Sequence, residues 1–274
     1  MDDFTINVVS NIGMISFLAL SAYVLLLTGE ISFGQQAYFA IGAYASGIAT
    51  AMWGWPLALA MGWAVAVGAA AGALVALPTI RLRGLYFSIA TLAFAEMVRH
   101  AFLIFTYRRE VDGYQVGPRG AEGFGDIRYI YENNITAMDY MVIIYALLAG
   151  VLALFVLMEW ARLGRILRMV GDDPVLAEMQ GINVTACKVL AATMAGGIAG
   201  LGGCLYAHLT TYVEPAIFNV MLGVHALAYG LIGGLGTALG PILGVVIDIG
   251  VLESTRMFSG YRMIVFGGLV AVIL

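Results

Sequence analysis

Ionisable side chains inside long apolar stretches are the residues of this sequence whose chemistry stands out. Glu96 and Arg99 lie three positions apart, so on a helix they share one face and are expected to neutralise each other. Asp248 lies in the apolar run GVVIDIGVLE, which contains no basic residue. A charge in a hydrocarbon environment is costly and is retained for a partner or for a function. We therefore expect Asp248 either to pack against another helix or to line an aqueous vestibule.

His208 and His225 flank the segment LTTYVEPAIFN, for which we predict a turn. Imidazole can bind metals or transfer protons near neutral pH. The sequence has no H-x-x-x-H pattern and no Cys/His cluster at metal-ligand spacing. We expect both histidines at the membrane interface and predict no metal site and no catalytic residue. Cys187 and Cys204 lie seventeen positions apart on one expected helix, too far apart to form a disulfide.

The elements that hold these residues are expected to be membrane-spanning helices. The chain has 274 residues, of which 62% are hydrophobic and 11% charged, and its mean hydropathy is +0.94. A soluble domain carries about 25% charged residues. The apolar runs are about 20 residues long, as a membrane-spanning helix requires, and lack the alternation typical of a membrane barrel. The net charge of −4 and the absence of a basic patch give no indication of a nucleic-acid partner.

We predict an all-α integral membrane protein, with one transmembrane domain over residues 1–274. The fold is expected to be a polytopic bundle of eight or nine helices, some of them discontinuous. The expected spans are 8–28, 32–52, 57–79, 85–106, 138–158, 187–209, 217–235, 239–255 and 261–274.

Two glycine-rich segments, at residues 30–47 and 230–244, are the expected discontinuities. Glycine accounts for 35 of the 274 residues, and small residues let membrane helices approach closely. The first segment, EISFGQQAYFAIGAYASG, also contains glutamines, and the second, GLIGGLGTALGPILG, contains a proline. Segments of this kind are typical of discontinuous helices that line a transport pathway. Tight packing of continuous helices is the alternative.

Three polar segments separate the spans: RLRG at 81–84, the long segment 107–139, and the segment 160–186. If the spans at 85–106 and 138–158 each cross once, the first and third segments lie on one side and 107–139 on the other. Arginine and lysine favour the cytoplasmic side, but their numbers on the two sides are equal and do not decide the orientation. We place 107–139 outside because it is rich in acidic residues, and 160–186 in the cytoplasm.

The third polar segment predicts a short helix. Asp172 or Asp173 is suited to the N-cap, and Pro174 to the first turn, where its missing N–H costs nothing. VLAEMQ continues as a helix of about two turns, and Gly181 is suited to the position past its end. Such a helix is too short to cross a membrane. It is either part of a solvated loop or a docking element for a soluble partner.

Residues 164–207, GRILRMVGDDPVLAEMQGINVTACKVLAATMAGGIAGLGGCLYA, resemble the coupling loop and following helix of LivM-type permease subunits of ABC importers for branched-chain amino acids. Three further segments fit this family in order: GEISFGQQAYFAIGAY, RLRGLYFSIATLAFAEMVR and YGLIGGLGTALGPILG. One residue and one segment depart from the family pattern. Pro174 stands where such loops usually carry a glutamate, and VDGYQVGPRG at 111–120 replaces a TGG-containing pattern, which leaves the substrate open.

The resemblance implies that residues 164–182 form a coupling helix, which docks into a cleft of a cytoplasmic ATPase. The residues assigned to this contact are Gly164, Arg165, Arg168, Asp172, Asp173, Pro174, Leu176, Ala177, Glu178, Met179 and Gly181. The implied partners are a second homologous permease subunit, two ATPase subunits and a soluble substrate-binding protein, in a bacterial inner membrane. The chain itself cannot complete a G-x-x-x-x-G-K-[ST] phosphate loop, since its one lysine, Lys188, follows Cys187. ATP and Mg²⁺ would therefore bind to the ATPase subunits, and no cofactor is expected on this chain.

An amino-acid pathway requires uncharged hydrogen-bonding groups and contacts weak enough for release. The residues that fit this requirement or lie within the membrane are Gln35, Gln36, Tyr38, Tyr44, Glu96, His225 and Tyr229. Branched-chain amino acids are the expected substrates, with urea, amides and aromatic acids as alternatives within the same class of importer.

Two other functional classes remain as alternatives. An ion-coupled secondary transporter would use Glu96 and Asp248 as carriers, and its uptake would continue without an ATPase. An intramembrane enzyme using His208, His225 or Glu96 would show turnover in the isolated chain.

Overall fold

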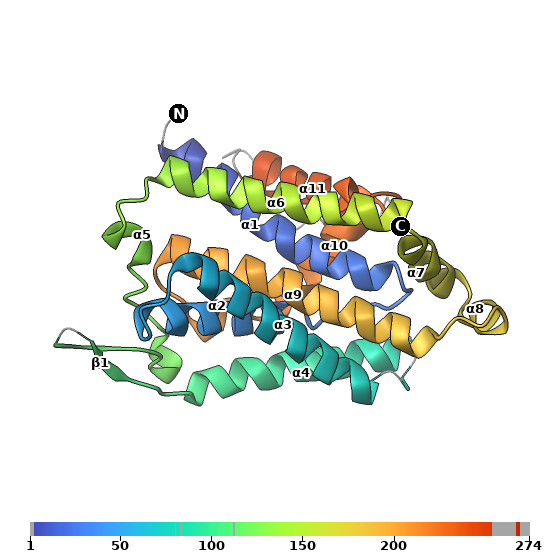
Figure 1. The fold of residues 1–274 in the computed structure, drawn as a ribbon, viewed down its shortest axis with the longest axis horizontal. Coiled ribbons are helices and arrows are strands. Elements are labelled where there is room, and N and C mark those ends of the chain that lie inside the picture. Colours follow the sequence, from blue (N-terminus) through green and yellow to red (C-terminus); the bar gives the residue numbers. More distant parts are fainter. Residues whose placement is uncertain (1–2, 80, 83, 112, 254–266, 269–274) are drawn as a thin grey trace.

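The computed structural model describes residues 3–79, 81–82, 84–111, 113–253 and 267–268. Its helices lie side by side as a bundle (Figure 1). The helices long and apolar enough to cross a membrane are α1 (Asp3–Leu26), α3 (Leu57–Thr79), α4 (Leu85–Ile104), α6 (Ala137–Trp160) and α9 (Val184–Thr210). The shorter apolar helices are α2 (Gln35–Ala51), α10 (Val220–Gly233) and α11 (Leu239–Val245), which continues as the π-helix η3 (Val246–Glu253).

This architecture confirms the prediction of an all-α polytopic membrane protein. Each expected span between residues 8 and 255 overlaps one of these helices. The last expected span, 261–274, lies outside the described residues except for 267–268.

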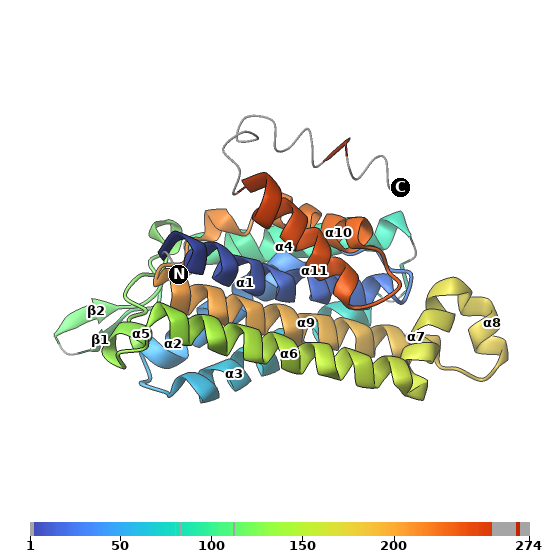
Figure 2. The same ribbon diagram turned by 90° about the horizontal axis from the view of Figure 1, so that it is seen from above.

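The two ends of the bundle carry different elements (Figures 1 and 2). One end carries the helices α7 (Arg162–Asp172) and α8 (Pro174–Met179). The opposite end carries the antiparallel strands β1 (Arg109–Val111) and β2 (Tyr114–Val116), the turn η1 (Gly120–Glu122), the helix α5 (Tyr129–Glu132) and the turn η2 (Pro215–Ile217). The chain around residues 81–84, of which residue 83 is outside the described residues, lies at the α8 end. Segments 81–84 and 160–186 therefore share one end, and 107–139 lies at the other, as predicted.

Backbone contacts between glycines join α2, α3 and α9. A Cβ atom on Gly203 would overlap the carbonyl oxygen of Phe39 in α2, and one on Gly68 in α3 would overlap that of Gly196. We call this contact the glycine seam, formed by Gly42, Gly68, Gly72, Gly196, Gly200 and Gly203. The abundance of glycine thus serves close helix packing at this seam.

The first glycine-rich segment begins with non-helical backbone between α1 and α2 and continues as α2, which is unbroken from Gln35 to Ala51. α1 ends at Leu26, α2 begins at Gln35, and residues 30–34 are not helical. Side chains of α4 satisfy this open backbone: Ser88 Oγ donates to the carbonyl oxygen of Ile31 (2.7 Å), and Thr91 Oγ1 accepts from the N–H of Phe33 (3.1 Å). Non-helical backbone inside a membrane protein requires such partners.

The second glycine-rich segment forms the turn between α10 and α11, so it joins two short helices instead of interrupting one. A Cβ atom on Gly233 would overlap the carbonyl oxygen of Gly240 on the other side of this turn. Gly234 has a φ of +82°, which favours glycine. Glycines at these positions allow the chain to reverse direction with the two helices in backbone contact.

Candidate functional site

The helix α8 is joined to α7 by one residue, Asp173, which is the C-cap of α7 and the N-cap of α8. Its Oδ1 atom accepts the N–H groups of Val175 (2.9 Å) and Leu176 (3.0 Å). Pro174 occupies the first turn, and Gly181, with a φ of +80°, follows the helix end. The predicted helix and its capping residues are confirmed, with Asp173 and not Asp172 as the N-cap.

Apolar side chains cover the exposed surface of α8. Val175, Leu176 and Met179 are 56%, 50% and 81% exposed, and we call them the α8 surface. An exposed cluster of large apolar side chains is typical of a contact with another protein. Ala177 does not belong to this surface, because it is buried with Val170 and anchors α8 to the rest of the chain.

The other residues assigned to coupling lie in two environments. Arg165, Asp172 and Glu178 are exposed. Gly164 is buried where α7 follows α6, with its α-carbon against the backbone of Met158. The guanidinium of Arg168 bonds to Glu159 and to the α10–α11 turn, and its side chain is still 40% exposed.

Replacing Asp173 by alanine is expected to loosen the start of α8. The variant loses both capping hydrogen bonds, at a cost of about 1 kcal/mol, which corresponds to about fivefold faster local opening. Hydrogen exchange at the amides of Val175 and Leu176 measures this change. Asp172→Ala is the matched control, since Asp172 does not cap α8; equal exchange rates in the two variants would contradict the prediction.

The predicted pathway residues of α2 lie at its contacts with α4 and α10. Gln35 and Gln36 are fully buried, and their amide atoms have no hydrogen-bond partner among the described residues. The Gln36 amide lies directly against Gly223 of α10. The ring of Tyr44 stacks on Phe102 of α4, with a centroid distance of 4.0 Å.

Tyr38 lies on the same side of α2, with its ring 5.7 Å from that of Phe94 in α4. Tyr38 and Tyr44 therefore contact α4 and Gln36 contacts α10, while Gln35 is buried on the same helix.

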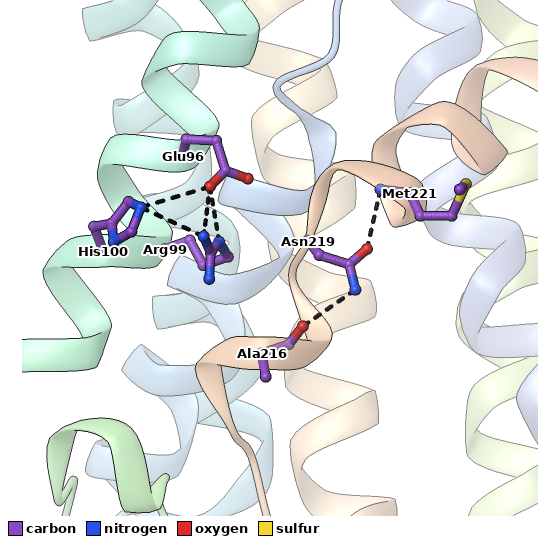
Figure 3. Close-up of polar contacts among 6 residues, drawn as sticks. All are labelled: Glu96, Arg99, His100, Ala216, Asn219 and Met221. Atoms are coloured by element: carbon purple, nitrogen blue, oxygen red, sulfur yellow. Dashed lines mark hydrogen bonds and ion pairs between the residues drawn. The ribbon is translucent and has the colours of Figure 1, made fainter.

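Glu96 belongs to a charged cluster on α4 (Figure 3). Its Oε2 atom lies 2.8 Å from the Arg99 guanidinium and 3.9 Å from His100 Nε2. The predicted neutralisation of Glu96 by Arg99 is confirmed. Asn219 caps α10 by accepting the N–H of Met221 (3.0 Å). Among the described residues, Glu96 pairs with residues of its own helix, Arg99 and His100.

His225 and Tyr229 of α10 face a different environment from Gln36. Tyr229 Oη donates to Asp248 Oδ2 of η3 (2.8 Å), and both residues are buried. The ring of His225 stacks on that of Tyr229, at a centroid distance of 6.0 Å. The structure therefore separates these residues from the α2 group, and it identifies a helix-packing partner for Asp248 that the sequence analysis missed.

His208, which was expected at the membrane interface, lies two residues before the end of α9 and is buried inside the protein. His208 is fully buried, its Nε2 atom lies 3.0 Å from Thr50 Oγ1, and its Nδ1 atom lies 2.8 Å from the carbonyl oxygen of Cys204. A buried polar group requires such partners, and the sequence gives no signal for a pair separated by so many positions. Cys187 and Cys204 are both free, as predicted.

Comparison with known proteins identifies the family. Residues 4–274 match the family described as branched-chain amino acid transport system / permease component. The high-affinity branched-chain amino acid transport system permease protein LivM of Salmonella typhimurium is 29% identical over 271 residues, which cover 90% of this chain and 62% of that protein. Its LivH counterpart is 28% identical over 147 residues, 53% of this chain and 47% of that protein.

The ribose import permease protein RbsC of Escherichia coli is 27% identical over 285 residues, covering 96% of this chain and 83% of that protein. No solved structure matches. The chain spans 62% of the length of the LivM protein it matches. Because the family match extends over nearly all of the chain, this multi-pass membrane protein belongs to the family of permease components of branched-chain amino acid transport systems.

Proposed function

We propose that this chain is the membrane-spanning subunit of an ABC importer that brings amino acids, branched-chain amino acids above all, into a bacterial cell across the inner membrane. The observation that carries the proposal is the α8 surface, three exposed apolar side chains on a capped helix outside the bundle. The LivM and LivH names of its relatives support the substrate class and a second homologous permease as partner.

In this proposal the α8 end faces the cytoplasm, and the end with β1 and β2 faces the binding protein. The α8 surface is seated in a cleft of an ATPase subunit, with one ATPase for each permease. ATP and Mg²⁺ bind to these subunits, and closure of the ATPases moves α8. Because one residue separates α8 from α7, a movement of α8 displaces α7 directly. The substrate then crosses by alternating access.

Co-purification and uptake test this function. The chain is expressed with its second permease, ATPases and binding protein, and the purified complex is reconstituted in liposomes. We expect the ATPases to co-purify and uptake to require ATP. Uptake that continues without the ATPases and collapses with an uncoupler would instead support the ion-coupled alternative. Ligand-induced shifts in the melting temperature of the binding protein, with leucine, ribose and urea compared, identify the substrate.

The Gln36→Leu variant tests the proposed pathway at the interface of α2, α4 and α10. Gln36 can hydrogen-bond to the charged ends of a passing amino acid, and losing such a bond, worth about 1.5 kcal/mol, corresponds to about tenfold slower uptake. The melting temperature should not fall, since the substitution removes buried polar atoms that have no partner among the described residues.

Ser10→Ala is the control, because Ser10 Oγ is also buried without a described partner but lies on α1. Ser10→Ala should leave uptake unchanged. Equal uptake by Gln36→Leu and the unchanged protein would remove Gln36 from the pathway.

A further inference from the structure

We propose that Arg168 is a positioning residue that transmits movement of α7 and α8 to the turn between α10 and α11. The inference rests on the proposed function, because it concerns how the force of the ATPases reaches the membrane. It is carried by a group of five residues from four separate parts of the chain, which we call the Arg168 cluster: Tyr23, Glu159, Arg168, Leu235 and Gly236.

The guanidinium of Arg168 connects three neighbours at once. Its Nη2 atom lies 3.0 Å from Glu159 Oε1 at the end of α6, 2.7 Å from the carbonyl oxygen of Gly236, and 3.5 Å from Tyr23 Oη in α1. The hydroxyl of Tyr23 lies 3.2 Å from Glu159 Oε1 and 3.4 Å from the carbonyl oxygen of Leu235. The planar guanidinium, with several N–H donors in a fixed arrangement, is suited to hold a carboxylate and a carbonyl together.

The carbonyl groups in this cluster belong to the turn that follows α10. Leu235 and Gly236 lie between the end of α10 at Gly233 and the start of α11, so their carbonyl groups belong to neither helix. The turn also contains Gly234, and glycine restricts the backbone little. The hydrogen bond from Arg168 to Gly236 therefore links a flexible turn to α7. The position of α10 depends on this link, because α10 ends at the turn.

Movement of α8 reaches Arg168 through a short and continuous path. Asp173 joins α8 to α7, and Arg168 lies about one turn before the end of α7. The same end of α7 also contacts the backbone just after α1: a Cβ atom on Gly171 would overlap the carbonyl oxygen of Leu27. α7 therefore contacts the segment after α1 through Gly171 and the α10–α11 turn through Arg168. A rotation of α7 about its contact with Leu27 displaces the turn.

The ion pair of the Arg168 cluster is partly exposed. The side chain of Arg168 is 40% exposed and that of Glu159 is 23% exposed. A cavity of about 370 Å³ lies beside Arg168 and is also lined by Leu27, Gly171 and Leu235. An ion pair with this exposure contributes little to stability, so its arrangement can change between transport states. The far end of the path is α10, whose Gly223 contacts Gln36.

Uptake per ATP hydrolysed tests the inference in the complete reconstituted complex. For Arg168→Gln, we expect the ATPases to co-purify and to hydrolyse ATP at nearly the unchanged rate, because the α8 surface is intact. Uptake per ATP should fall about tenfold, within the usual range of coupling between two sites. Arg168→Lys should recover part of the ratio, since an ammonium group can still pair with Glu159. A merely structural role would lower the melting temperature and both rates together.

Arg162→Gln is the matched control, because Arg162 is exposed on the first turn of α7 and outside the cluster. If Arg168→Gln does not accumulate as a folded complex, the Tyr23→Phe variant is used instead. It removes one hydroxyl of the Arg168 cluster and should also lower uptake per ATP hydrolysed. The inference would be overturned if uptake per ATP hydrolysed were normal in Arg168→Gln, or in Tyr23→Phe where that variant is used instead. Failure of the proposed function would be distinguishable, because the unchanged complex would then neither retain the ATPases nor require ATP.

Discussion

Replacing Leu176 by aspartate is expected to abolish binding-protein-stimulated ATP hydrolysis and uptake while the membrane bundle remains folded. In the proposed complex Leu176 is inserted into an apolar cleft of the ATPase, where a carboxylate would be desolvated without a partner. Loss of a central interface residue costs about 2 kcal/mol or more, which corresponds to at least about 30-fold weaker association. Co-purification of the ATPases and stimulated ATP hydrolysis measure the effect.

The fold of this variant should be intact, because Leu176 is half exposed and Ala177 supplies the buried contact of α8. Thr185→Asp is the matched control: Thr185 is exposed in the first turn of α9, where a negative charge is tolerated. The control should retain the ATPases. If Leu176→Asp retains them equally well, with normal stimulation, α8 is not the docking element.

Replacing Gly203 by valine is expected to prevent correct packing of α2 against α9. The Cβ atom of the new side chain would overlap the carbonyl oxygen of Phe39, so α2 and α9 would have to separate. We expect a loss of about 3 kcal/mol or more, at the upper end of the cost of overpacking, because backbone atoms cannot move aside as side chains do. The measurements are the yield of monodisperse protein in detergent and its melting temperature.

Gly150→Val provides the comparison, since a Cβ atom on Gly150 in α6 meets no atom within 4 Å. Both substitutions add the same side chain to the interior of a membrane helix. A similar yield and melting temperature for the two variants would show that the glycine seam is not needed for folding.

Sequence patterns predicted the features of this protein that depend on nearby residues. The cap at Asp173, the proline at position 174 and the glycine at position 181 act within one or two turns, so their roles can be inferred without knowing the fold. The Glu96–Arg99 pair was predictable for the same reason. The lengths of the apolar runs predicted the approximate positions of the membrane helices, because the thickness of a membrane sets the length of a helix that crosses it.

Contacts between distant segments could not be predicted in this way. The bonds of Arg168 to Glu159 and Gly236 join α7 to the end of α6 and to the turn after α10, which no local pattern in the sequence indicates. Tyr229 and Asp248 lie on neighbouring helices whose rotation brings them together. Membrane helices are apolar on the lipid side and on the buried side alike, so their sequences lack the stripe that reveals the buried face of a soluble helix.

The glycine seam also limits which conformational changes are available to the chain. Where two backbones are in direct contact, no side chain lies between them that could change its rotamer to make room. A small sliding movement of one helix along the other would therefore bring carbonyl groups into collision. Domain motion in this protein should therefore leave α2, α3 and α9 as a single moving body. Relative displacement is confined to boundaries filled by side chains, such as the aromatic contact between Tyr44 and Phe102, where rings can change rotamer as one helix slides past the other.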